Sequence, residues 1–182
     1  MRRPVSHALL LLSVAGVSVA CGGGDNDLSG SISESFSLDF DRVEVRYLVT
    51  TEELTIQYLK DLGNTTTKPV KVVVDADNLA LGEDTRVAGE TFLERVVIQR
   101  EAESGGDFPA VTGGTVVFDR ININVREITE ERNGEEFTFF TEPEGDIEVR
   151  GEFDAVFENG RTLFGDFSSN LQVDDPDAPV GN

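Results

Sequence analysis

The most regular feature of the sequence is an alternation of apolar and polar residues that begins near Gly30. A period of two places successive side chains on opposite faces of a strand, so each alternating series predicts a strand with one buried face. Three consecutive apolar residues, Val96 to Ile98, predict burial on both faces or a bulge. The alternating segments are 32–40, 43–49, 70–74, 92–98, 116–118, 121–125 and 147–171.

The last of these segments predicts a long antiparallel hairpin. Asn159-Gly160 lies between two apolar series of the same parity, and both residues accept the positive φ of a type I′ turn. Gly151 and Gly165 occupy positions on the apolar faces of the two strands. We expect these glycines to make room for large neighbours, or to mark a bulge.

A second Asn-Gly pair, Asn133-Gly134, predicts another hairpin. It would join a strand that ends near Glu131 to a strand that contains Phe137 and Phe139. Because adjacent side chains of a strand point to opposite faces, we expect one of Phe139 and Phe140 to be exposed, where it would contribute to a surface for a partner. Chain twist or a strand end at this pair is the alternative.

The segment Thr51–Leu62 fits either a helix or a strand. Thr50 and Glu53 have the spacing of a capping box, which is typical of a helix start. Leu54, Ile56 and Tyr58 alternate instead with polar residues. We favour the strand, because a hairpin agrees with the strands predicted on both sides.

About eight to ten short strands separated by turn signals predict an all-β fold. An antiparallel β-sandwich is favoured over a partly closed β-barrel, since nothing in the sequence specifies closure. We expect a single domain over residues 30–172, followed by a loose acidic tail over residues 173–182.

The N-terminus has the layout of an export signal, with Arg2 and Arg3 before an apolar core that is too short to span a membrane. The residues Ser18-Val19-Ala20-Cys21 resemble the lipobox of bacterial lipoproteins, with Ser18 where that family usually has Leu. The resemblance implies that residues 1–20 are removed after Ala20 and that Cys21 receives a diacylglyceride and palmitate. Residues 21–29 would then be the lipidated cysteine and a flexible tether. A plain secretory peptide is the alternative.

The rest of the chain is similar in pattern to small uncharacterised lipoproteins of Gram-negative bacteria, most clearly over residues 151–167. That resemblance implies no particular activity. In well-studied enterobacterial lipoproteins an Asp after the cysteine favours retention in the inner membrane. Gly22 occupies that position here, so the resemblance implies an anchor in the outer membrane.

Composition excludes several classes of function. The 182 residues have a formal charge of −20, which becomes −22 if residues 1–20 are removed, because these contain two arginines and no acid. Such a charge repels nucleic acids and anionic lipid headgroups. The sequence has one histidine (His7), one cysteine and no tryptophan. Without residues 1–20, Ser-His-Asp and Cys-His catalysis, zinc sites built on His or Cys and a histidine pH switch are all excluded.

Carboxylates are the remaining chemical groups of interest. Asp75, Asp77 and Asp84 surround one loop and are weak candidates for calcium ligands, because calcium prefers oxygen ligands. The spacing does not fit an EF-hand, since Leu79 occupies a ligand position. Two carboxylates suffice for glycoside hydrolysis, but 35 acidic residues offer every spacing, so this pattern is not specific.

Three hypotheses follow from the sequence. The first is a non-catalytic, lipid-anchored envelope protein whose β domain has a structural role or binds a protein partner. The second is a calcium-dependent binding or adhesion module, which calcium would stabilise thermally. The third is a hydrolase that uses only carboxylates, which requires a cleft with a carboxyl group of raised pKa. We favour the first, which requires neither an enzyme nor a cofactor.

Overall fold

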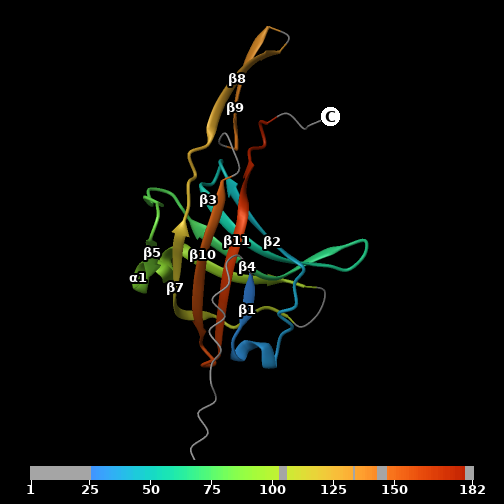
Figure 1. Cartoon of the computed structure of the whole chain (residues 1–182), viewed down its shortest axis with the longest axis vertical. Helices are drawn as coiled ribbons and strands as arrows, with labels where there is room; N and C mark the ends of the chain where they lie inside the picture. The colour runs from blue at the N-terminus through green and yellow to red at the C-terminus, as the bar shows by residue number, and fades with distance from the viewer. Residues whose placement is uncertain (1–25, 103–105, 133, 143–146, 179–182) are drawn as a thin grey trace, which may run out of the picture.

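A computed structural model describes residues 26–102, 106–132, 134–142 and 147–178 (Figure 1). The helices are the short 3₁₀ helix η1 (Ser31–Glu34) and α1 (Gly89–Arg95). The strands are β1 (Asp27–Ser29), β2 (Arg42–Leu48), β3 (Glu53–Asp61), β4 (Thr66–Asp75), β5 (Thr85–Ala88), β6 (Val96–Glu101), β7 (Val111–Arg120), β8 (Arg126–Arg132), β9 (Glu135–Thr141), β10 (Glu148–Phe157) and β11 (Thr162–Asp174).

Nine of these strands form one large curled sheet, which confirms the all-β class. Its order is β5-β7-β10-β11-β2-β3-β4-β6, with β1 paired to β11. The pair β11 and β2 is parallel and the other pairs described are antiparallel, so the sheet is mixed rather than wholly antiparallel. Strands β8 and β9 form a separate two-stranded hairpin.

Helix α1 connects the two edges of the curled sheet. Its seven residues join β5 directly to β6, although these strands are at opposite ends of the strand order. Phe92 of α1 is fully buried, and Cβ of any side chain larger than Gly at position 114 in β7 would lie 2.6 Å from its Cζ. The curl is consistent with a sandwich or a half-barrel, with α1 packed where the edges approach.

The hydrophobic core lies on the inner face of the curl. One cluster of buried side chains contains alternate residues of β2, β4, β10 and β11, together with Leu54, Ile56 and Tyr58 of β3 and Val116 and Phe118 of β7. Tyr58, Phe118, Phe157 and Phe167 are among its largest fully buried side chains. Burial of a large apolar side chain stabilises a fold by about 1.5–3 kcal/mol, so this face supplies most of the stability.

The hairpin of β10 and β11 is built on paired glycines and phenylalanines, as expected from the sequence. Gly151 is opposite Phe167, and Gly165 is opposite Phe153. A Cβ at Gly151 would lie 2.7 Å from Cζ of Phe167, and one at Gly165 would lie 2.7 Å from Cζ of Phe153. Each ring therefore lies over the backbone of the opposite strand, where a side chain would collide with it.

Other expectations are also confirmed. Residues 53–61 form a strand, β3, and not a helix. Gly160 has φ 76° at the turn between β10 and β11. The hairpin expected around Asn133-Gly134 is the pair of β8 and β9, with Gly134 at φ 83°, while Asn133 lies outside the described residues.

Three segments differ from the predicted strands. Residues 31–34 are a 3₁₀ helix and 35–41 have no regular structure, although Ile32 is buried and Phe36, Leu38 and Phe40 pack against the core. Residues 89–95 are helical, and Val97 is 55% exposed, so burial of Val96 to Ile98 on both faces is wrong. Residues 121–125 are irregular. In residues 31–41, 89–95 and 121–125 apolar side chains contact the core although the backbone is not in a strand.

The boundaries of the domain are also wider than predicted. Residues 27–29, assigned from the sequence to the tether, form β1 and pair with β11. Strand β11 continues to Asp174, two residues beyond the predicted end of the domain, because its last four residues pair with β2.

Two neighbouring glycines of β7 provide a test of this packing. We expect Gly114→Ala to lower the free energy of unfolding by about 1–3 kcal/mol, since its Cβ would collide with Phe92 and with backbone of β10. Gly113→Ala meets nothing within 4 Å and serves as the control, with an expected change within about 0.5 kcal/mol. Urea unfolding followed by circular dichroism measures both. Equal effects of the two substitutions would contradict this account of the closure.

Candidate functional site

The residues singled out by the lipobox cannot be placed. Ala20 and Cys21 lie outside the described residues. In the part of the chain that is described, no helix has the length and apolar character needed to cross a membrane.

The three candidate calcium ligands lie around a turn after β4. The Asp75 carboxylate accepts a hydrogen bond from the backbone N–H of Asp77 (3.0 Å) and lies 3.5 Å from the Arg95 guanidinium. Arg95 also donates to the backbone carbonyl of Asp77 (2.7 Å), and Asp84 adopts φ 60° in the turn before β5. The Arg95 guanidinium thus holds this turn of acidic residues in place.

The described residues show no grouping of these aspartates as metal ligands. Across residues 26–102, 106–132, 134–142 and 147–178, no three Asp, Glu, His or Cys side chains are grouped so that they could hold a metal ion. The geometry therefore gives no support to the calcium hypothesis.

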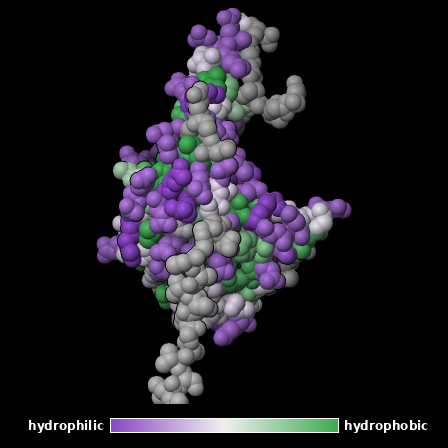
Figure 2. All heavy atoms as spheres, in the orientation of Figure 1, coloured by the Kyte–Doolittle hydropathy of each residue, from purple (hydrophilic) through white to green (hydrophobic). Residues whose placement is uncertain are grey.

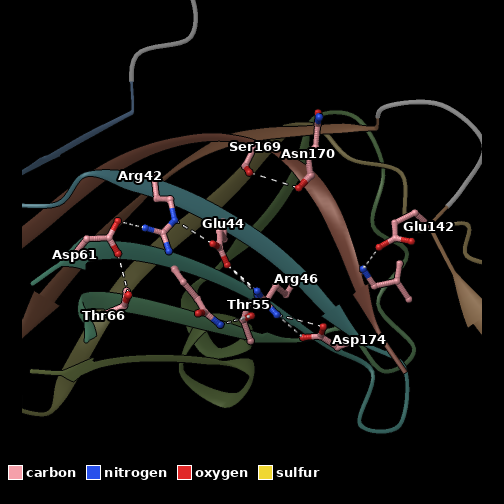
Figure 3. Close-up of polar contacts among 12 residues, drawn as sticks. Arg42, Glu44, Arg46, Thr55, Asp61, Thr66, Glu142, Ser169, Asn170 and Asp174 are labelled. Atoms are coloured by element: carbon pink, nitrogen blue, oxygen red, sulfur yellow. Dashed lines mark hydrogen bonds and ion pairs between the residues drawn. The ribbon is translucent and has the colours of Figure 1, made fainter. Parts of the chain in front are cut away.

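A polar trough of about 420 Å³ lies on the outer face of β2, β3 and β4. Figure 3 shows several of its side chains, among them Arg42, Glu44 and Arg46. At its floor Thr55 and Gln57 are only 3% and 9% exposed, and the Gln57 amide donates to the Thr55 hydroxyl (3.2 Å). Its cationic side chains are Arg42, Arg46, Lys68 and Lys71. Long charged side chains from β2 and β4 thus enclose the short polar residues of β3.

Each of these four cations is paired with a carboxylate. Arg46 contacts Glu44 (2.8 Å) and Asp174 (3.3 Å), and Arg42 contacts Glu44 and Asp61. Partial burial raises the pKa of Glu44, but hydrogen bonds from the two arginines outweigh it and leave that pKa below its usual value. The remaining pairs join both lysines to Glu101. Carboxylates in or beside the trough therefore neutralise its four cations.

A second depression, of about 230 Å³, lies on the outer face of β1, β11, β10 and β7. The register places Asp166 of β11 opposite both Glu152 of β10 and Asp27 of β1. Asp154 also lines the depression, and its one cation, Arg86, donates to the Thr115 hydroxyl (3.4 Å). Three strands thus bring carboxylates side by side, an arrangement that is destabilising when like charges are directly opposite.

Asp166 is the perturbed group of this acidic depression. Partial burial, followed by the negative charges of Asp27 and Asp119, raises its pKa above the usual value. Its backbone carbonyl accepts a hydrogen bond from the buried Tyr58 hydroxyl (2.7 Å). Burial and the charges of Asp166 and Asp27 raise the pKa of Tyr58 well above its usual value.

The acidic depression meets only part of what the hydrolase hypothesis requires. It contains a carboxyl group of raised pKa, but its volume is below the roughly 300–1,000 Å³ of typical ligand pockets. The sequence predicted the hairpin that pairs Glu152 with Asp166, but it could not reveal that Asp27 joins them, because β1 pairs with β11 from far away in the chain.

The hairpin of β8 and β9, here called the arm, is the third surface feature. It extends away from the sheet along the long axis of the molecule (Figure 1). Ile128 is paired with Phe139, Glu130 with Phe137, and the hydroxyls of Thr129 and Thr138 lie 3.1 Å apart. Cross-strand pairs of this kind are what hold an isolated hairpin together.

The base of the arm is tied to the end of β11. The Asp175 carboxylate accepts a hydrogen bond from the backbone N–H of Phe140 (2.7 Å), and the Glu142 carboxylate accepts one from that of Val173 (3.2 Å). Phe139 is buried and Phe140 partly buried, whereas Phe137, further from the base, is 41% exposed. The expectation that Phe139 or Phe140 is exposed is therefore wrong, because both rings lie near the base of the arm, and the exposed ring is that of Phe137.

Comparison of the chain with models of protein families, with curated proteins and with solved structures finds no match.

Substitution of Asp166 tests the electrostatics of the acidic depression. Folding raises the pKa of the Asp166 carboxyl group, so the folded protein loses stability as the pH rises from the usual pKa through the raised one. At neutral pH the charged carboxylate therefore opposes folding. We expect Asp166→Asn to increase the melting temperature at pH 7. The increase should vanish below pH 3.8, the usual pKa of the group, where both states are protonated.

A control carboxylate of β11 should respond in the opposite direction. Asp174 pairs with Arg46 (3.3 Å), so Asp174→Asn should leave the stability at pH 7 unchanged or lower it by up to about 1 kcal/mol. Thermal unfolding of both variants between pH 3 and pH 8 provides the measurement. A lower melting temperature of Asp166→Asn at pH 7 would show that the Asp166 charge stabilises the fold.

Proposed function

We propose that this protein is a non-catalytic envelope lipoprotein, anchored through Cys21 to the outer membrane, whose β domain binds a protein partner through the arm. The observation that carries the proposal is the exposed Phe137 on a hairpin that projects from the body of the molecule.

The energetics of the arm support a binding role. Two-stranded hairpins are marginally stable in water, and this one also places Glu131 opposite Glu136. Phe137 leaves much of an aromatic ring in contact with solvent. A partner that covers this ring would gain the large contact area that makes aromatic residues prominent in interfaces.

The position of the arm also suits a protein anchored at its N-terminus. Strand β1, the first strand, lies in the half of the molecule away from the arm (Figure 1). Asp27 lies six positions after Cys21, and six residues of chain reach about 20 Å at most. An anchor at Cys21 would therefore hold the sheet near the membrane, with the arm directed away from it.

Lipidation is tested by the mass of the mature protein from membranes of its native host. We expect the N-terminus to begin at Cys21 and to have the mass of a diacyl or triacyl modification, because several acyl chains are needed for stable anchoring. Cys21→Ser should remove the modification and release the protein from membranes. An unmodified N-terminus on the natural chain would leave a secreted β domain and refute the anchor.

Partner binding is tested by a photo-crosslinking phenylalanine analogue at position 137, activated in native cells. We expect one discrete crosslinked product, because Phe137 would lie in the interface. The control is the same analogue at Phe164, which is 46% exposed but lies at the acidic depression. No product from position 137, or the same products from both positions, would refute the proposed role of the arm.

A further inference from the structure

Strand β8 lies at the outer side of the arm. In the described part of the chain β8 forms a ladder with β9 alone, and the base of β9 lies beside the end of β11. Among the described residues no strand lies along the opposite edge of β8, and the backbone of such an edge is a ready template for another strand.

The side chains of β8 differ between its two faces. Glu127, Thr129 and Glu131 share one face, and Ile128 and Glu130 lie on the other. Figure 2 shows hydrophobic surface on the arm between hydrophilic side chains. A strand beside β8 would have its own residues opposite each of these, so their chemistry specifies its sequence.

We propose that the edge of β8 binds an extended segment of a partner protein, with basic residues opposite Glu127 and Glu131 and an apolar residue opposite Ile128. This inference rests on the proposed function of the arm and defines its mode of binding, which is strand addition. Backbone hydrogen bonds would supply affinity, while the alternating side chains supply specificity.

Charge selects this occupant over a second copy of the chain. Residues 126–141 contain five glutamates and two arginines, and the whole chain has a formal charge of −20. Pairing of two arms would place glutamates near glutamates, and like charges across a strand pair are destabilising. Charged side chains along an edge also protect it from pairing with itself. A basic strand is attracted by the same charges.

The probe is the peptide Thr-Thr-Lys-Val-Thr-Val-Lys-Thr-Thr, added to the mature full-length chain at 150 mM salt. Its central five residues read the same in both directions, so a parallel or an antiparallel strand places Lys opposite Glu127 and Glu131. The control peptide has the same sequence and charge but is N-methylated at alternate residues, which removes backbone donors. We expect fluorescence anisotropy to show at least tenfold weaker binding of the control.

Two charge-reversal variants distinguish the edge of β8 from general attraction to an acidic protein. Glu127→Lys with Glu131→Lys should weaken peptide binding at least tenfold. Glu135→Lys with Glu136→Lys changes the net charge by the same amount on β9 and should weaken binding less than threefold. Circular dichroism of both variants confirms that the β fold is retained.

Several results would overturn the inference: no measurable binding of the peptide, equal binding of its N-methylated form, or equal weakening by both double variants. These results are separable from failure of the proposed function. A discrete crosslinked product from position 137 together with any of them would leave the arm as a binding element and reject strand addition at β8.

Discussion

The architecture depends on β11, the strand that joins the two halves of the curled sheet. Its first part pairs with β10 on one edge and β1 on the other, and its last four residues pair in parallel with β2. These pairings require the neighbouring strands to stay close to β11 while large aromatic rings fill the core. Gly151 and Gly165 make that possible, because Phe167 and Phe153 lie across the backbone opposite them. Without these glycine–phenylalanine pairs, β10 and β11 would have to move apart, and the ladder that both halves of the sheet depend on would be disrupted.

The division of the sheet by β11 also determines the charge of its outer faces. On the side of β2, β3 and β4, cations from neighbouring strands face carboxylates and form ion pairs. On the side of β10 and β1, the ladder places carboxylate beside carboxylate. Exposed ion pairs contribute at most about 1 kcal/mol each, whereas each large buried side chain contributes about 1.5–3 kcal/mol. The core therefore tolerates an outer face whose charges repel.

The sequence predicted features that depend on neighbouring residues and missed those that depend on distant ones. The strand at 53–61 and both Asn-Gly hairpins follow from local alternation and turn chemistry. The parallel pairing of β11 with β2 joins residues more than one hundred positions apart, and no local pattern encodes it. Phe92 fits an alternating series but belongs to a helix of seven residues, too short to show helical periodicity. The place of Asp27 in the acidic depression has the same origin, since β1 pairs with a strand far away in the chain. The candidate aspartates at 75, 77 and 84 are close in sequence, which is why a sequence pattern singles them out.

The arm is the part of the structure whose own contacts stabilise it least. Most strands of the large sheet bury alternate side chains in a shared core, but the arm buries few and opposes Glu131 to Glu136. Two hydrogen bonds tie the ends of β9 and β11 together, and the arm would gain more from a partner than the core-forming strands would. The hydrogen bond from Phe140 to Asp175 lies on the β9 side of the arm, and no strand of the described chain pairs with the outer edge of β8. The acidic edge of β8 protects the arm against pairing with itself, while the half-exposed ring of Phe137 leaves a hydrophobic contact incomplete. A strand of basic and apolar residues from another protein would complement both the acidic edge and the ring.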